Sequence, residues 1–345
     1  MSVSLRLATM ALPFALLTGC GAGDASRDSI RAVGSSTVLP FAKMVAQDFA
    51  RSNPDFRSPI IESTGTGAGF ALFCRGVGPD TPDIANASRR IKASEFAECQ
   101  ANGVSDIVEI QIGLDGLAFA SAKNGITMNL TPEIVYRALA ARPYGQPQTA
   151  QNWSDVDPAL PGQRILVYGP PATSGTRDAL NELVLEKGCA ANPTMAALEE
   201  RDADEYDKVC TELRTDGSFV AQGEQDNLIV QKIEANPQAV GVFGFSYLEE
   251  NLDRLQDLPV NGVQATYDNI ASASYLGARP MLIYIKKAHL DAIPGLRQFV
   301  ALWAKSWGRD GPLAQRGLVA SPPAVAEENT RRATEFTPLS ASDLG

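Results

Sequence analysis

The chain has 345 residues, of which 44% are hydrophobic and 20% are charged, so its composition is that of a globular protein and not of a disordered or collagen-like one. Its formal net charge is −10 and its pI is about 4.8, which argues against binding to nucleic acid or to an anionic membrane surface. The length suffices for two domains of ordinary size. The single histidine, His289, excludes a histidine-based metal site, and we expect no cofactor.

The first 19 residues have the pattern of a lipoprotein signal peptide. The apolar stretch 7–17 is too short to span a bilayer as a mature helix. Residues 17–20, Leu-Thr-Gly-Cys, form a lipobox that would be cut before Cys20. We therefore predict lipidation of Cys20, a tether over residues 20–29, and a periplasmic, lipid-anchored protein. The alternative is an ordinary signal peptide that happens to contain a cysteine.

Four further cysteines indicate disulfides, because an even number in an exported chain is typical of an oxidising compartment. They are Cys74, Cys99, Cys189 and Cys210. Three pairings are open. The local pairing, Cys74 with Cys99 and Cys189 with Cys210, closes two short loops of similar length and is the one we favour. No Cys/His spacing suggests zinc.

After residue 29, short apolar segments alternate with helical patterns, which indicates an α/β fold with mostly parallel strands. Three places share one local design, in which an apolar strand leads through a turn of small residues into an amphipathic helix. The strands cover 30–33, 59–61 and 165–168, and the turns cover 34–37, 63–69 and 169–176. The first helix places one apolar face at Val38, Phe41, Met44, Val45 and Phe49, and the third helix is expected to stop near Gly188.

Each turn ends in serine, threonine or glycine at the start of its helix. These residues are good N-caps, and they leave backbone N–H groups exposed at the positive end of the helix dipole. In an open α/β sheet such turns lie at the carboxyl ends of the strands, where ligands bind. The pattern therefore predicts an anion site built from several helix starts. The alternative is three ordinary helix caps.

Two arginines lie close to such turns. Arg177 directly follows the Ser-Gly-Thr string 174–176, and its guanidinium can bind a tetrahedral oxyanion through two hydrogen bonds. Asp178 can orient Arg177 or stabilise the first helical turn. A further short apolar strand within the string 83–90 would bring residues 86–89 to the same sheet edge, where Arg89 would add charge to the anion site. The alternative for Arg89 is a surface charge.

The sequence gives little support for catalysis. The glycine-rich string 65–69 lacks both the Gly-Lys-Ser/Thr of a P-loop and the last glycine of a dinucleotide fingerprint. No Gly-x-Ser-x-Gly elbow surrounds Ser36 or Ser174, and His289 is distant from both along the chain. We therefore expect a binding protein and not an enzyme.

Taken in order, these strings resemble the phosphate-binding subunit of the bacterial phosphate ABC transporter, in the type II periplasmic-binding-protein superfamily. The strings that carry the resemblance are 34–41, 65–69, 83–89, 174–178, 241–246 and 278–286. The resemblance implies a two-lobed α/β fold, each lobe a mostly parallel sheet flanked by helices, with the ligand in the interlobe cleft. Lobe one would comprise residues 30–116 and 246–345, and lobe two residues 117–245. A monomer that delivers phosphate to a membrane permease is also implied.

The resemblance further implies which residues bind the anion. They are Ser36, Thr37, Val38, Gly67, Ala68, Gly69, Arg89, Ser174, Gly175, Thr176 and Arg177. The chain departs from the family at two positions. Arg89 stands where an aspartate accepts the proton of hydrogen phosphate, and Pro170 stands where an arginine binds the anion. Asp226 or Glu62 could supply the missing acceptor.

Because of these departures, the ligand and the role of the chain stay open at this point. Sulfate, molybdate or tungstate could be the ligand in place of phosphate. The chain could also be a sensing or adhesive surface lipoprotein, or an extracytoplasmic phosphohydrolase.

Overall fold

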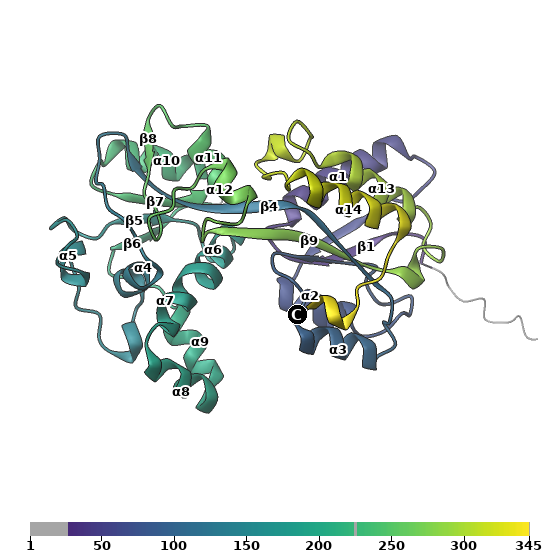
Figure 1. Cartoon of the computed structure of the whole chain (residues 1–345), viewed down its shortest axis with the longest axis horizontal. Helices are drawn as coiled ribbons and strands as arrows, with labels where there is room; N and C mark the ends of the chain where they lie inside the picture. Colours follow the sequence, from purple (N-terminus) through teal and green to yellow (C-terminus); the bar gives the residue numbers. More distant parts are fainter. Residues whose placement is uncertain (1–26, 224–225, 345) are drawn as a thin grey trace, which may run out of the picture.

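The structure is a computed structural model that describes residues 27–223 and 226–344. The predicted signal peptide, Cys20 and most of the predicted tether lie outside the described residues. Two lobes lie side by side, and the strands β4 (Ile107–Ala122) and β9 (Ala278–Lys286) run between them (Figure 1). Within the described residues, no helix combines the length and apolar character needed to cross a membrane.

Lobe one is a sheet with helices on both faces. Its strands are, in spatial order, β2 (Ile60–Ser63), β1 (Arg31–Gly34), β3 (Ile84–Ala87), β9 and the first part of β4. Its helices are α1 (Leu39–Ser52), α2 (Thr66–Phe73), α3 (Ala93–Ala101), α13 (Leu296–Ser306) and α14 (Pro323–Glu335). Three short 3₁₀ segments complete it, η3 (Lys287–His289), η4 (Ala314–Arg316) and η5 (Ala341–Leu344).

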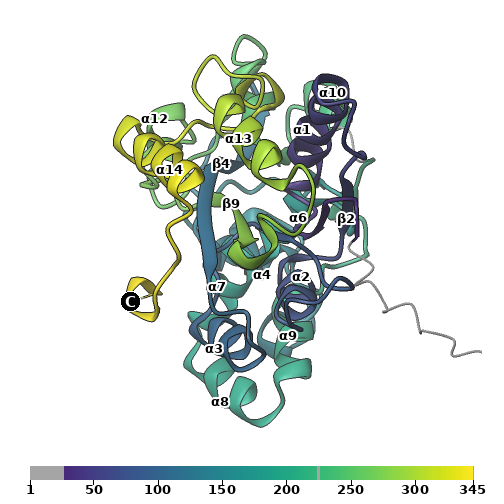
Figure 2. The ribbon, with the colours of Figure 1, turned by 90° about the vertical axis from the view of Figure 1, so that its right-hand side faces the viewer.

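The strands of lobe one separate two cores. Ile84 and Ile283 pack with α1 and α13, whereas Ala85 and Tyr284, their neighbours in sequence, pack with α2 and α3. Successive side chains of a strand point to opposite faces, so continuously apolar strands can be covered on both sides. In the end-on view, α13 lies above β9 while α2 and α3 lie below it (Figure 2).

Helix α1 buries the apolar face that its sequence predicts. Phe41, Val45 and Phe49 recur every four residues and are buried against the sheet, and Val38 is buried just before the helix begins. Met44, expected on the same face, is only partly buried.

Lobe two is built on the second part of β4. The strands β7 (Val240–Gly244), β5 (Val167–Gly169) and β6 (Phe219–Ala221) follow β4 on one side, and β8 (Leu255–Asp257) pairs with it as well. Its helices are α4 (Pro132–Leu139), α5 (Trp153–Val156), α6 (Gly175–Leu180), α7 (Glu186–Ala190), α8 (Pro193–Arg201), α9 (Ala203–Thr211), α10 (Asp226–Ala235), α11 (Phe245–Glu249) and α12 (Tyr267–Ala271), with a 3₁₀ turn η1 (Pro143–Gly145).

The third predicted helix is one continuous helical stretch. A π-helical turn, η2 (Asn181–Leu185), joins α6 to α7, and the residues at both junctions keep right-handed helical backbone angles. The stretch ends at Ala190, two residues beyond the predicted end near Gly188.

The α/β fold class is confirmed, but the sheet is mixed and not mostly parallel. Parallel pairing joins β1 to β2 and β3, and β5 to β6 and β7. Every pairing that involves β4 or β9 is antiparallel. The strands that pass between the lobes are therefore antiparallel to their neighbours. The pattern of strand–turn–helix units in the sequence does not predict this pairing.

The predicted return of the chain to lobe one at residue 246 is wrong. Strand β4 pairs with β9 up to Gly116 and with β7 from Leu117 onward. Leu248, Leu255 and Ile270 belong to the lobe-two core, because β8 and α12 pack on the second part of β4. The chain crosses back through β9.

Both disulfides have the favoured local pairing. Cys74–Cys99 joins the end of α2 to α3, and Cys189–Cys210 joins α7 to α9. The prediction from loop length is thus confirmed.

A buried polar cluster accounts for the only histidine. His289 Nδ1 lies 2.6 Å from Asp83 Oδ1 and its Nε2 lies 2.9 Å from the carbonyl of Val77. Asp83 Oδ2 accepts a 2.7 Å hydrogen bond from the backbone N–H of Arg31. These bonds join the loop before β3 to β1 and to the end of β9. Asp83 and His289 therefore stabilise the fold.

Candidate anion-binding site

Two of the predicted turns meet face to face between the lobes. The turn after β1 contains Ser36 and Thr37, and the start of α6 contains Gly175. The approach is so close that a Cβ atom on Gly175 would lie 2.2 Å from Thr37 Oγ1 and 2.6 Å from Thr37 Cα. Only glycine fits at this position when the lobes are together.

A second contact crosses the cleft beside the first. Ser36 Oγ donates a 2.7 Å hydrogen bond to Asp178 Oδ2 in the first turns of α6. The two residues are 142 positions apart in the sequence. The structure therefore has the lobes in contact at the predicted site.

A cavity of about 630 Å³ adjoins these contacts. Both lobes line it, and five of the eleven predicted ligand residues are among its walls. These five are Ser36, Thr37, Ser174, Gly175 and Thr176. The structure thus brings residues from two distant parts of the chain to one hollow between the lobes.

Serine side chains organise both turns. Ser35 Oγ accepts hydrogen bonds from the backbone N–H groups of Thr37 and Val38, at 3.2 and 3.4 Å. Ser174 Oγ accepts from the N–H of Thr176 at 3.2 Å. Ser174 is thus the N-cap that holds the start of α6 in place, whereas Ser35 fixes the turn that precedes α1. The arrangement favours a negatively charged ligand.

Arg279 is the buried cation at this meeting point, behind the residues that line the cavity, and it is not among the residues predicted from the sequence. The arginine among the lining residues is Arg316. Its Nη2 donates to Thr37 Oγ1 and to the carbonyl of Gly175, both at 2.7 Å, so that one guanidinium touches both lobes. Asp115 Oδ2 lies 3.3 Å from Nε. The residue is only 2% exposed.

One nitrogen of this buried guanidinium lacks a hydrogen bond. Arg279 Nη1 has no hydrogen-bonding partner among the described residues, and its nearest charge is the Glu182 carboxylate at 3.6 Å. A buried donor without an acceptor is uncommon, and an oxyanion would satisfy it. The sequence did contain a signal, because Arg279 directly precedes the mainly apolar segment 280–285, within a string that carries the family resemblance.

The glycine-rich turn lies on lobe one but does not line the cavity. Gly65, with φ of 79°, begins α2, and Gly69 packs so closely on Gly34 that a Cβ would lie 2.6 Å from its Cα. Gly67 and Ala68 are exposed at this helix start. The turn is therefore placed beside the β1 turn, as neighbouring parallel strands require.

Arg89 is held by a neighbouring carboxylate. Its Nη1 and Nη2 donate to the two oxygens of Glu95 at 2.9 and 2.7 Å, and this hydrogen bonding raises the pKa of Arg89. A Cβ on Gly67 would lie 3.8 Å from Arg89 Nη2. Arg89 thus lies beside the glycine-rich helix start but is not part of the cavity wall.

Arg177 faces its own lobe. Its Nη2 donates to the carbonyl of Pro170 at 2.7 Å, and its guanidinium carbon lies 4.6 Å from the centre of the Phe219 ring. Burial lowers the pKa of Arg177. These contacts support the 169–176 turn from behind, and Arg177 is not among the residues that line the cavity.

The two suggested proton acceptors are separated by the structure. Asp226 lines the cavity, and its Oδ2 accepts a 3.0 Å hydrogen bond from the N–H of Gly244. Glu62 lies on the edge strand β2, has a side chain that is 44% exposed, and pairs with Arg31. Glu62 does not line the cavity.

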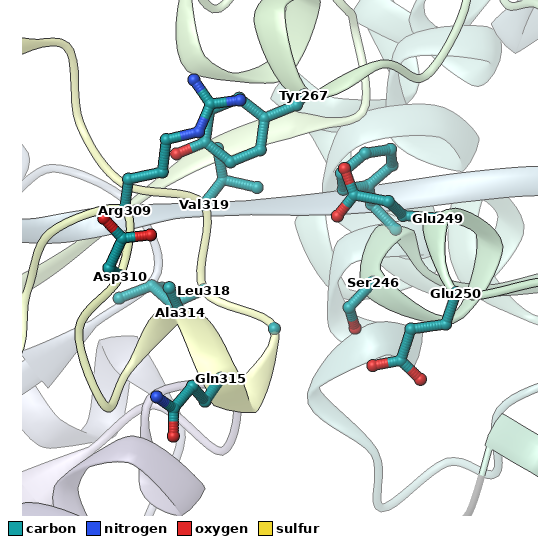
Figure 3. A pocket seen from close by; sticks show the side chains of 12 residues that line it. Ser246, Glu249, Glu250, Tyr267, Arg309, Asp310, Ala314, Gln315, Leu318 and Val319 are labelled. Carbon is teal, nitrogen blue, oxygen red and sulfur yellow. The ribbon is translucent and has the colours of Figure 1, made fainter.

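A second hollow of about 410 Å³ adjoins the first and shares Ser246 and Gly317 with it. Figure 3 shows Glu249 and Glu250 on its lobe-two side. Its cation, Arg309, is stacked over the Tyr267 ring at 4.6 Å. None of the predicted ligand residues lines this second hollow, so the first cavity remains the candidate site.

Comparison with known proteins agrees with this arrangement. A family model described as the PBP superfamily domain matches residues 21–305. Protein SphX of Synechococcus elongatus is 31% identical over 318 residues, covering 89% of this chain and 83% of SphX. Phosphate-binding protein PstS of Staphylococcus saprophyticus is 28% identical over 326 residues, covering 91% and 89% of the two chains.

Solved structures show the same similarity. A protein of Planctomyces limnophilus, described as a possible phosphate binding protein, is 26% identical with a TM-score of 0.70 and covers 89% of this chain and 98% of its own. An ABC-type phosphate transport receptor from Vibrio cholerae, 22% identical with a TM-score of 0.59, covers 85% of this chain and 99% of its own and shares the fold.

Proposed function

Because the chain belongs to the PBP superfamily, we propose that it is the extracytoplasmic phosphate receptor of an ABC importer. The relatives named phosphate-binding protein, and the similar structures described as phosphate receptors, support phosphate as the ligand. The function is capture and delivery, with no bond made or broken in the ligand.

One observation carries the proposal. Two serine- and threonine-rich helix starts from different lobes meet at a single buried arginine, Arg279, which bonds to Thr37 and Gly175 and still has one nitrogen without a hydrogen bond among the described residues. Amide, hydroxyl and guanidinium hydrogens are the groups that replace the hydration shell of an oxyanion. Each charge-assisted bond contributes about 1.5–3 kcal/mol, and several are needed to offset the desolvation of a multiply charged ion.

We assign the binding roles from this geometry. Thr37 and the 174–176 turn provide hydroxyl and amide donors, Ser36 lines the site beside them, and Arg279 takes the place of the arginine that the family has at Pro170. The glycine-rich helix start at 67–69 and Arg89 would form the outer wall on lobe one, and Arg177 would support the 174–176 turn from behind. The chain can hold an anion despite its charge of −10, since the local field dominates at contact distance.

The same proposal includes where the protein is located and which membrane protein it serves. Lipidation of Cys20 would anchor a monomeric receptor at the membrane, where a permease takes up the released phosphate. The Leu-Thr-Gly-Cys string supports this anchor. Partitioning of the chain into a detergent phase, lost on Cys20→Ala, tests it.

The test is calorimetric titration of the phosphate-free protein with phosphate, sulfate, molybdate and tungstate. We expect phosphate to bind most tightly, and Arg279→Met to weaken it by about 100-fold, because the bond of Nη1 to the anion and the bonds that join the Thr37 and Gly175 turns are lost together. The matched control is Arg51→Met, on the outer end of α1, where the side chain is 78% exposed. Tighter binding of another anion would reassign the ligand, and an unchanged affinity in Arg279→Met would remove Arg279 from the site.

A further inference from the structure

The hydrogen bond between Ser36 and Asp178 has a direction that matters for the ligand. Asp178 lies in α6 of lobe two and Ser36 in the first turn of lobe one, and their oxygens are 2.7 Å apart. An ionised carboxylate can only accept a hydrogen bond, so the Ser36 hydroxyl must donate. Having donated its single hydrogen to Asp178, Ser36 has only acceptor lone pairs to present to the cavity that it lines.

The other carboxylates near the site are engaged differently. Glu95 uses both oxygens on Arg89, which stands where the family has its proton-accepting aspartate. Asp115 lies against Arg279, and Asp226 accepts from the backbone of its own lobe. Asp178 is the carboxylate here whose hydrogen bond reaches a hydroxyl of the opposite lobe.

We propose that the Ser36–Asp178 pair is the proton acceptor that makes this site prefer a protonated oxyanion over sulfate. This inference rests on the proposed function and assigns the acceptor that the sequence lacks at position 89. The P–OH group of hydrogen phosphate donates to Ser36 Oγ, which in turn donates to Asp178. Such a chain of hydrogen bonds ending on a charge is mutually strengthening.

Sulfate cannot donate the hydrogen bond that this pair accepts. It carries no proton near neutral pH, so its oxygens would face the lone pairs of Ser36 and, behind them, the negative charge of Asp178. Two acceptors that face each other form no hydrogen bond. A buried sulfate oxygen would therefore lack a partner, and sulfate would bind more weakly than phosphate. The charged groups around the pair are Arg177 in the same turn, Glu182 one turn further along the helix, and Arg279 from β9 at Thr37.

The experiment compares the affinities of three tetrahedral anions at pH 7 by calorimetry. Phosphate and arsenate carry a proton, and sulfate does not. In Asp178→Ala the Ser36 hydrogen is released to donate to any anion, so we expect the phosphate-to-sulfate affinity ratio to fall at least about tenfold, with arsenate following phosphate. Ser36→Ala removes the acceptor and lowers the ratio likewise, whereas Ser36→Thr keeps the hydroxyl and preserves it.

The phosphate-to-sulfate affinity ratio distinguishes a selective proton acceptor from a contact that only holds the lobes together. If Asp178→Ala and Ser36→Ala weaken phosphate and sulfate equally, the pair only holds the lobes together and the inference is wrong. A wild-type protein that binds sulfate as tightly as phosphate also overturns it, while oxyanion binding stands. A wild-type protein that binds none of the three anions contradicts the proposed function itself. Unchanged circular-dichroism melting curves establish that each variant is folded.

Discussion

At the scale of single residues, burial changes the ionisation of a carboxylate at the start of α7, Glu186. Burial raises the pKa of Glu186 to about 7, the neighbouring Glu182 and Asp207 add to the rise, and Lys92 of lobe one opposes it. The ordinary value is 4.5. Between pH 4.5 and about 7, Glu186 is therefore protonated in the folded protein and ionised in the unfolded chain. The free energy of unfolding falls as the pH rises through this window.

We therefore predict that Glu186→Gln stabilises the protein at pH 8 by about 1–2 kcal/mol, after allowance for solvent screening. At pH 4 the two proteins should be equally stable, because Glu186 is then protonated in both states. Urea denaturation at the two pH values measures this. The matched control is Glu200→Gln, on the exposed face of α8. A pH-independent effect of Glu186→Gln would show that packing and not ionisation is responsible.

At the scale of elements, α7, α8 and α9 extend from lobe two away from its sheet (Figure 1). Each of these helices has only two buried residues, such as Met195 and Leu198 in α8. Cys189–Cys210 ties α7 to α9 across 21 positions of sequence. The cross-link compensates for a small core by limiting the conformations of the unfolded chain.

We predict that the double substitution Cys189→Ala/Cys210→Ala lowers the free energy of unfolding by about 3 kcal/mol, the value for a loop of this length. Urea denaturation of the oxidised wild type and of the variant measures the difference. Removing both cysteines avoids a free thiol in the comparison. A loss below about 1 kcal/mol would show that the unfolded chain is already restricted in this region.

At the scale of the whole molecule, the contact of Gly175 with Thr37 limits how the lobes close. An added methyl group would lie 2.6 Å from backbone atoms of Thr37, which cannot move aside as a flexible side chain can. Because the contact is between lobes, the substitution disfavours the closed arrangement and leaves each lobe intact.

We predict that Gly175→Ala weakens phosphate binding at least about tenfold while the thermal melting of the ligand-free protein changes little. X-ray scattering with saturating phosphate should then show a larger radius of gyration than in wild type. The control is Gly78→Ala, where an added Cβ meets no atom within 4 Å. Wild-type affinity in Gly175→Ala would mean that phosphate binds without this contact.

Much of the fold follows from local patterns in the sequence. The apolar face of α1 is predicted by the four-residue spacing of Phe41, Val45 and Phe49, and all three side chains are buried in the structure. Two disulfides closing short loops were expected and are present. Such features depend on residues close together in the chain, so helix periodicity, capping and loop length are sufficient to predict them. The family resemblance added the two-lobed arrangement, through ordered strings and not through periodicity.

The remainder depends on contacts between distant segments, which only the tertiary structure decides. Arg177 follows the most suggestive string in the sequence, yet it bonds to Pro170 in its own lobe, while Arg279, more than a hundred residues later, reaches both Thr37 and Gly175. The return through β9 is likewise set by its antiparallel pairing with β4. The direction of a long side chain and the partner of a strand depend on what packs beside them, and no periodicity within one segment carries that information.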